Sequence, residues 1–86
     1  MKDGLNIGLD GAKYWHKMNK LHREDGPAIE DSDGNNDWWV NGVLHRIDGP
    51  AIIYSEGYKE WHFRGLKIDC STQEEFERLI KLKAFW

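Results

Sequence analysis

The strongest constraint on this chain is a nine-residue segment that occurs twice, 23 residues apart. LHREDGPAI begins at Leu21 and LHRIDGPAI begins at Leu44, and the two differ at one position. The same spacing relates three tryptophans and three glycines: Trp15, Trp38 and Trp61, and Gly11, Gly34 and Gly57. A period of this length is typical of proteins that stack one small structural unit, so the 86-residue chain is expected to form a repeat array.

The periodic glycines predict where the chain turns, because glycine adopts positive φ at little cost. One set of hairpin turns is expected at Asp10-Gly11, Asp33-Gly34 and Glu56-Gly57, and a second set at Asn41-Gly42 and Arg64-Gly65. The segments between these turns have the length of short strands. Each repeat is therefore predicted to be a pair of antiparallel strands, and residues 3–11 match the later units if one residue is deleted.

Strand residues alternate between the two faces of a sheet, which predicts how the aromatic residues are distributed. In GYKEWHF, Trp61 shares a face with Lys59 and Phe63, whereas Tyr58, Glu60 and His62 lie on the other face. Repeats stacked in register then align the three periodic tryptophans in one row. We expect this row to be the core, with Ile29 and Ile52 contributed by the intervening strands.

The pattern W-x-x-N-G-x-L-H-R-x-D-G-P-A-I-x-x-x-x-G-x-x-x-W, read from Trp38 through Trp61, resembles the MORN repeat (membrane occupation and recognition nexus). The resemblance covers residues 3–68 and is nearest to variant repeats of small bacterial and phage proteins. It implies an elongated, twisted antiparallel sheet that binds proteins or lipids without catalysis. The first unit departs from the pattern with Met18-Asn19 in place of Asn-Gly, and the third unit ends without a His-Arg pair.

After residue 68 the sequence changes character and predicts a helix from about Thr72 to Lys83. Ser71 followed by Glu74 is a capping-box signature, and Phe76, Leu79 and Ile80 form an apolar stripe. The helix is expected to pack on the sheet or to close its last edge; the alternative is that it docks a partner or a second copy of the chain.

The fold class that follows is mainly β. We expect a single twisted antiparallel β-meander of about three 23-residue hairpin repeats with a C-terminal capping α-helix. The whole chain, residues 1–86, is one domain, with the repeat sheet in residues 3–68 and the helical segment in residues 71–86.

The repeated His-Arg segment has two interpretations. Residues copied at a fixed period generally serve the geometry of each unit, with Arg23 near Asp25 and Arg46 near Asp48 in a turn. Repeated units also repeat surfaces, so the basic side chains form a candidate anion-binding row: His22, Arg23, His45 and Arg46.

Other chemistry receives little support from the sequence. The acidic stretch Asp31–Asp37 lacks the glycine and glutamate spacing of a calcium loop, and the histidines have no zinc-ligand spacing. Cys70, the single cysteine, is interpreted as a partly buried junction residue; a pKa lowered by the helix start is the alternative. We expect no catalytic residue, no metal ligand and no cofactor, so the protein is not expected to be an enzyme.

Charge and hydropathy limit the classes of partner. A net charge of −3 argues against broad attraction to nucleic acid or to an anionic membrane, and no apolar run approaches the length of a membrane span. The first residues do not form a signal peptide, so we expect a cytoplasmic protein, in the host cytoplasm if it is phage-encoded.

The expected function is non-catalytic protein binding by a small phage or bacterial inhibitor or adaptor, such as an anti-defence protein. The face opposite the tryptophan row supplies the predicted contact residues: Trp39, His62, His16 and Tyr58. The alternative is that the His-Arg turns sequester or sense a phosphorylated small ligand. A homo-oligomer through a sheet edge or the C-terminal helix is a further expectation.

Overall fold

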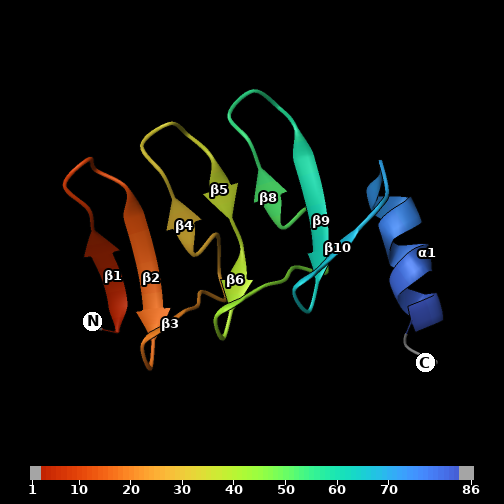
Figure 1. Cartoon of the computed structure of the whole chain (residues 1–86), viewed down its shortest axis with the longest axis horizontal. Coiled ribbons are helices and arrows are strands. Elements are labelled where there is room, and N and C mark those ends of the chain that lie inside the picture. Colours follow the sequence, from red (N-terminus) through yellow and green to blue (C-terminus); the bar gives the residue numbers. More distant parts are fainter. Residues whose placement is uncertain (1–2, 84–86) are drawn as a thin grey trace.

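The strands of this protein lie side by side along its long axis, and the helix stands at the C-terminal end of the row (Figure 1). The structure, a computed structural model, describes residues 3–83 and measures 40 × 30 × 17 Å. Within these residues, ten short strands form antiparallel sheets and are followed by one α-helix, which confirms the predicted mainly β fold class.

Each repeat contributes two hairpins that share a strand. The strands of the first repeat are β1 (Gly4–Ile7), β2 (Lys13–Lys17) and β3 (Lys20–Leu21). Those of the second are β4 (Ile29–Glu30), β5 (Asn36–Asp37), β6 (Trp39–Val40) and β7 (Val43–Leu44). Those of the third are β8 (Ile52–Ile53), β9 (Lys59–Phe63) and β10 (Leu66–Ile68). The shared strand is continuous in β2 and β9 but is divided at Trp38 into β5 and β6.

The strands pair in the order β1-β2-β4-β5-β8-β9-β10, with β3 also paired to β2, and β6 and β7 form a separate two-stranded ladder. Neighbouring repeats join through short ladders in which Tyr14 lies opposite Ile29 and Asp37 lies opposite Ile52. The sheet is therefore built by adding one repeat beside the next.

The predicted turns are present. Gly11, Gly34 and Gly57 have φ between 88° and 100°, as the first set of turns requires. In the second set, both central residues have positive φ, the signature of a tight type I′ hairpin turn: Met18-Asn19, Asn41-Gly42 and Arg64-Gly65. Met18 and Asn19 adopt this geometry at φ of 50° and 64°, so the first repeat keeps the turn without its glycine.

The first hairpin follows the 23-residue period without interruption. Gly8 N–H donates to the Ala12 carbonyl at 2.8 Å, and Asp31 N–H donates to the Asn35 carbonyl in the same position of the next repeat. From Leu5 onward the first repeat is in register with the later ones, so the one-residue deletion expected from the sequence falls before Leu5, at the position of Pro27. Leu5 therefore occupies the position of Ala28 and Ala51.

The helix α1 (Gln73–Lys83) begins one residue later than expected. Its capping box is also displaced by one residue, since Thr72 Oγ1 accepts from Glu75 N–H and Glu75 Oε1 accepts from Ser71 N–H. Phe76 is fully buried and packs with Trp61 and Ile68 in the main apolar cluster. Of the two roles foreseen for the helix, the structure shows packing on the sheet.

The side chains are distributed over the two faces of the sheet differently from the prediction. Cross-strand pairs place Ile29 and Ile52 on the same face as Tyr14, Asp37 and Glu60, opposite the periodic tryptophans. The prediction that these isoleucines complete the tryptophan core is therefore wrong. The fully buried residues whose carbonyls accept the Trp15 and Trp38 N–H groups are small ones, Ala28 and Ala51.

We call the face that carries Trp15, Trp38, Trp61 and α1 the helix face. We call the opposite face the open face, and its central residues are Tyr14, Ile29, Asp37, Trp39, Ile52 and Glu60. The helix packs at one end of the helix face only, because its contacts gather around Trp61.

Candidate functional site

The repeated arginines lie flat on the repeated tryptophans. Arg23 Cζ is 3.8 Å from the centre of the Trp15 ring, and Arg46 Cζ is 3.9 Å from the centre of the Trp38 ring. In each case the HRxDGP segment folds the guanidinium back over the tryptophan of its own repeat. Such stacking is stabilising because the ring face is electron-rich and the planar cation loses little hydration there.

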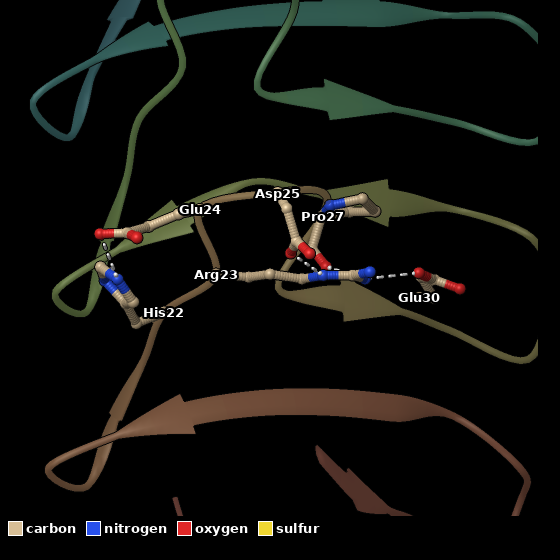
Figure 2. A network of polar contacts seen from close by, with 6 residues as sticks. All are labelled: His22, Arg23, Glu24, Asp25, Pro27 and Glu30. Atoms are coloured by element: carbon tan, nitrogen blue, oxygen red, sulfur yellow. Dashed lines mark hydrogen bonds and ion pairs between the residues drawn. The ribbon is translucent and has the colours of Figure 1, made fainter. Parts of the chain in front are cut away.

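Arg23 is further held by three acceptors (Figure 2). Its Nε donates to Asp25 at 2.9 Å, and its Nη1 donates to the Pro27 carbonyl at 3.1 Å and to Glu30 at 2.9 Å. The guanidinium beside Asp25 holds the pKa of that carboxyl below its ordinary value. The positive charge of Arg23 is thus largely matched by Asp25 of its own turn and by Glu30 of β4.

Arg46 has one acceptor fewer. It donates to Asp48 at 3.0 Å and to the Pro50 carbonyl at 3.1 Å, but the position of Glu30 is occupied by Ile53 in this repeat. The second turn therefore has the same geometry as the first with a less neutralised guanidinium.

Gly49 lies directly against this arginine. A Cβ at Gly49 would be 2.6 Å from Arg46 Cζ, and a Cβ at Gly26 would be 2.9 Å from Arg23 Cζ. Neither glycine has positive φ. A side chain at either glycine would force the stacked guanidinium to shift, which links the repeated glycine to the repeated arginine, a relation that the sequence did not reveal.

The repeated histidines connect each repeat to the next. His22 Nδ1 accepts the Asn41 N–H at 3.0 Å, and His45 Nδ1 accepts the Arg64 N–H at 2.9 Å. In both cases the donor is the first residue of the following type I′ turn. Burial, together with the positive charge of Arg64, lowers the pKa of His45 and favours the neutral ring that this bond requires.

A shallow groove of about 670 Å³ lies between the two His-Arg turns. It brings together three of the four candidate anion-binding residues, Arg23, His45 and Arg46, whereas His22 is not part of its lining. Three carboxylates line the same groove: Glu24, Asp25 and Asp48. The groove has arginine and tryptophan surfaces, but acidic side chains offset its positive charge.

The predicted contact residues of the open face differ in exposure. Tyr58 is 70% exposed and Trp39 is half-buried, but His16 and His62 are each only 8% exposed. The prediction that both histidines form an exposed contact surface is wrong. The strands that return from the second turns lie beside them, with Leu21 opposite His16 and Lys67 opposite His62.

The buried histidine His62 belongs to a polar network on the open face. Glu60 accepts from the Tyr54 hydroxyl at 2.9 Å and lies 3.0 Å from His62 Nε2. These hydrogen bonds, that of His62 first, hold the pKa of Glu60 below its ordinary value. Glu60 is thus a carboxylate with two hydrogen-bond partners and an additional ion pair with Lys67 at 4.0 Å.

Asp37, at the centre of the open face, is in the opposite situation. Loss of hydration is the main cause that raises its pKa, and the charges of Asp31 and Glu60 add to it, whereas the facing Trp39 indole N–H and the charge of His62 act in the opposite direction. The Trp39 N–H does not reach hydrogen-bond geometry with any acceptor of the described residues. Asp37 therefore lacks the close donors that stabilise Glu60. It is the carboxylate of this face that would gain most from an added cation.

Neither the acidic stretch nor the cysteine forms a reactive centre. Asp31 accepts the N–H groups of Asp33 and Asn35, both at 2.9 Å, so its carboxylate closes the turn. Burial and the nearby carboxylates of Glu75 and Asp69 raise the pKa of Cys70, which contradicts the alternative of a lowered pKa. Within residues 3–83, no group of three or more potential ligand side chains is arranged to hold a metal ion.

The helix found within residues 3–83 is not long and apolar enough to cross a membrane.

Comparison with known proteins gives no match: no family model fits the chain, and no curated protein or solved structure is significantly similar to it.

Proposed function

We propose that this chain is a non-catalytic protein-binding module that occupies the surface of a partner protein with its open face. The observation that carries the proposal is the composition of that face. Asp37 lies among partly exposed apolar and aromatic side chains: Tyr14, Ile29, Trp39 and Ile52. Tryptophan and tyrosine beside a poorly hydrated charge are typical of interface hot spots.

The raised pKa of Asp37 indicates which charge the partner surface should carry. A carboxylate that has lost hydration and faces two other carboxylates is stabilised by a cationic side chain placed against it. The partner surface is therefore expected to present a lysine or arginine to Asp37, surrounded by apolar groups that contact Trp39 and Ile52.

The repeated motif supports a scaffolding role for the His-Arg turns. Arg23 makes three hydrogen bonds to its turn and to the strand that follows it, and the Nδ1 atoms of His22 and His45 accept backbone N–H groups of the next repeat. Side chains that are engaged in this way hold the array together and leave the open face for recognition.

The identity of such a partner rests on the sequence resemblance alone. The LHRxDGPA segments resemble MORN-like repeats of small bacterial and phage proteins. On this basis the protein is a phage or bacterial inhibitor or adaptor, active in the cytoplasm of the host cell and directed against a defence protein.

The test is affinity capture from a bacterial lysate, followed by titration of the purified partner. Trp39→Ala is expected to weaken binding by about 2 kcal/mol or more, and Asp37→Asn to weaken it without altering the circular dichroism spectrum. Tyr58→Ala should have a smaller effect at the edge of the face. Lys59→Ala is the matched control, because Lys59 follows Tyr58 in the chain but points to the helix face. Equal losses for Lys59→Ala and Trp39→Ala would contradict the proposal.

A second candidate function, sequestering or sensing a phosphorylated small ligand, is supported by the groove between the His-Arg turns. Arg46 lacks the third acceptor of Arg23 and lines the groove with His45. The carboxylate of Asp48 in the same groove weighs against an anion. Titration with inorganic phosphate and with a nucleotide should shift the Arg46 and His45 resonances. Arg46→Gln should abolish these shifts, whereas Arg78→Gln, at an exposed arginine of α1 away from the groove, should leave them. Unchanged spectra would reject this function.

A further inference from the structure

The two ends of the sheet are finished differently. At the C-terminal end, α1 packs against the last repeat, whereas at the other end β1 has no neighbour on its outer side among residues 3–83 (Figure 1). Natural proteins generally blunt such an edge with lysine, proline, a bulge or a covering segment. Residues 4–9, GLNIGL, contain no charge and no proline, and Leu5 and Ile7 are 47% and 65% exposed.

The backbone of β1 offers unpaired groups on this outer side. Leu5 lies opposite Trp15, and the Trp15 N–H donates to the Ala28 carbonyl of the next repeat at 2.8 Å, away from β1. Leu5 and Trp15 are therefore a non-hydrogen-bonded pair, so the N–H and C=O of Leu5 point outward. The same holds two residues later at Ile7, because the Gly8 backbone points inward to Ala12.

The repeat geometry shows that this edge is suited to pairing. Leu5 occupies the position of Ala28 and Ala51, whose carbonyls accept the tryptophan N–H of the preceding repeat at 2.8 and 2.7 Å. Within residues 3–83, no tryptophan N–H donates to the carbonyl of Leu5. The same strand edge is therefore paired at the two junctions between repeats and unpaired at β1.

We propose that β1 pairs with β1 of a second copy, antiparallel about a two-fold axis at Asn6. In this register Leu5 of each copy lies opposite Ile7 of the other, and these two pairs exchange four backbone hydrogen bonds. The four apolar side chains meet on the helix face, where Leu5 and Ile7 both point. No charged residue of the strand opposes another, since residues 4–9 are uncharged.

A second copy fits this edge better than a longer polymer. Pairing of β1 with the opposite end of another molecule would build an open chain, but α1 stands beside β10 at that end (Figure 1). The two-fold arrangement uses both free edges at once and closes. A four-residue edge buries little area, so the dimer belongs to the weak, concentration-dependent class.

Sedimentation equilibrium over a range of concentrations tests the pairing. The expected result is a mass that rises from 10.1 kDa to twice that value and no further. Hydrogen exchange should show the Leu5 and Ile7 amides becoming protected as the concentration rises, although both point away from β2. A protein that stays monomeric at the highest attainable concentration, or one that forms a series of larger species, overturns the proposal.

Paired substitutions test the register. Leu5→Lys with Ile7→Lys places four positive charges together and is expected to abolish the dimer, whereas Leu5→Glu with Ile7→Lys places opposite charges across the interface and retains it. Ile7→Pro removes only an outward N–H and should also leave a folded monomer. Leu82→Lys on the exposed side of α1 is the matched control. A dimer that survives the double lysine variant but dissociates in Leu82→Lys overturns the proposal and assigns the contact to the helix.

Each variant is compared with the wild-type protein by circular dichroism at a concentration where both are monomers. This comparison separates loss of pairing from loss of fold. The dimer is independent of the open face, so binding of a partner and self-association succeed or fail separately.

Discussion

Trp38 and Trp61 occupy the same position in successive repeats, yet one is covered by an arginine and the other by a helix. Arg46 stacks on Trp38 at 3.9 Å and leaves the ring half-buried. Trp61 is 6% exposed, packs with Phe76, and donates from its indole N–H to Gln73 at 2.8 Å. The third repeat has no His-Arg segment, so α1 covers the ring instead.

The difference shows that a repeat can cover its tryptophan with one of its own side chains, but that this cover leaves part of the ring exposed to water. A single stacked guanidinium keeps its hydrated edge in contact with water, whereas an apolar helix removes the ring from water. Most of the free energy of apolar burial is therefore expected at the C-terminal end, although the repeats have nearly the same sequence.

The largest expected effect is that of Phe76→Ala. Phe76 is the one large side chain that is fully buried within the described residues, so its truncation should lower the free energy of unfolding by about 3–5 kcal/mol. Urea denaturation measures the change. Leu82→Ala, on the exposed side of the same helix, should change it by less than about 0.5 kcal/mol. Similar losses for both variants would mean that α1 does not cover Trp61.

Trp38→Ala should cost less, about 2 kcal/mol, because the Trp38 ring is only half-buried under Arg46. Trp61→Ala should approach the loss of Phe76→Ala. Thermal and urea unfolding of the two tryptophan variants compare the two kinds of cover directly. A Trp38 variant as unstable as the Trp61 variant would contradict the comparison.

Gly49→Ala should destabilise the fold by about 1–3 kcal/mol, because its Cβ overlaps the stacked guanidinium of Arg46. The loss should largely disappear in an Arg46→Ala background, since the obstructing group is then absent. A double-mutant cycle measures this coupling, which is expected to exceed about 0.5 kcal/mol. Additive losses would show that Gly49 is required for another reason.

Arg23→Ala should cost more than Arg46→Ala, by about 0.5–1 kcal/mol, because Arg23 has the additional ion pair with Glu30. Glu30→Ile makes the first turn like the second, so Arg23→Ala should cost about as much in the Glu30→Ile protein as Arg46→Ala costs in the wild type. Chemical denaturation of the single variants and of the Arg23→Ala, Glu30→Ile double variant gives the comparison. Equal effects of the two arginine variants would mean that the Glu30 contact adds nothing.

The smallest effect concerns pH. Because the pKa of His45 is lowered in the folded protein, the unfolded chain binds the proton more readily below about pH 6.5. The contribution of His45 is therefore present at pH 7.5 and is lost as the pH falls through its folded pKa. Urea denaturation at pH 7.5 and pH 5 should show a decline that is smaller in His45→Gln. A stability that rises on acidification over this range would contradict the assignment.

The features that the sequence predicts well are those determined by neighbouring residues. The turns at Gly34 and Asn41-Gly42 follow from the conformational freedom of glycine and asparagine, and the helix follows from its apolar stripe. The 23-residue period also identifies Arg23 and Asp25 as partners in one turn.

The failures concern relations between strands. Moving a strand by one residue transfers its side chains to the other face, and Ile29 was assigned to the wrong face for this reason. The burial of His16 and His62 depends on the strands that follow the second turns and on how neighbouring repeats pack, which the turn pattern alone does not give. The contact that makes Gly49 necessary arises only after Arg46 has folded back onto Trp38.

The joints between repeats bear on how such a protein changes over generations. Gly42 N–H donates to the Leu21 carbonyl and Gly65 N–H donates to the Leu44 carbonyl, both at 2.8 Å, next to the two histidine links. A segment of 23 residues thus carries both the donor half and the acceptor half of the joint. An in-frame duplication of one such segment in the gene would insert a unit whose ends already fit its neighbours, so the length of the array is free to change while its two ends stay as they are.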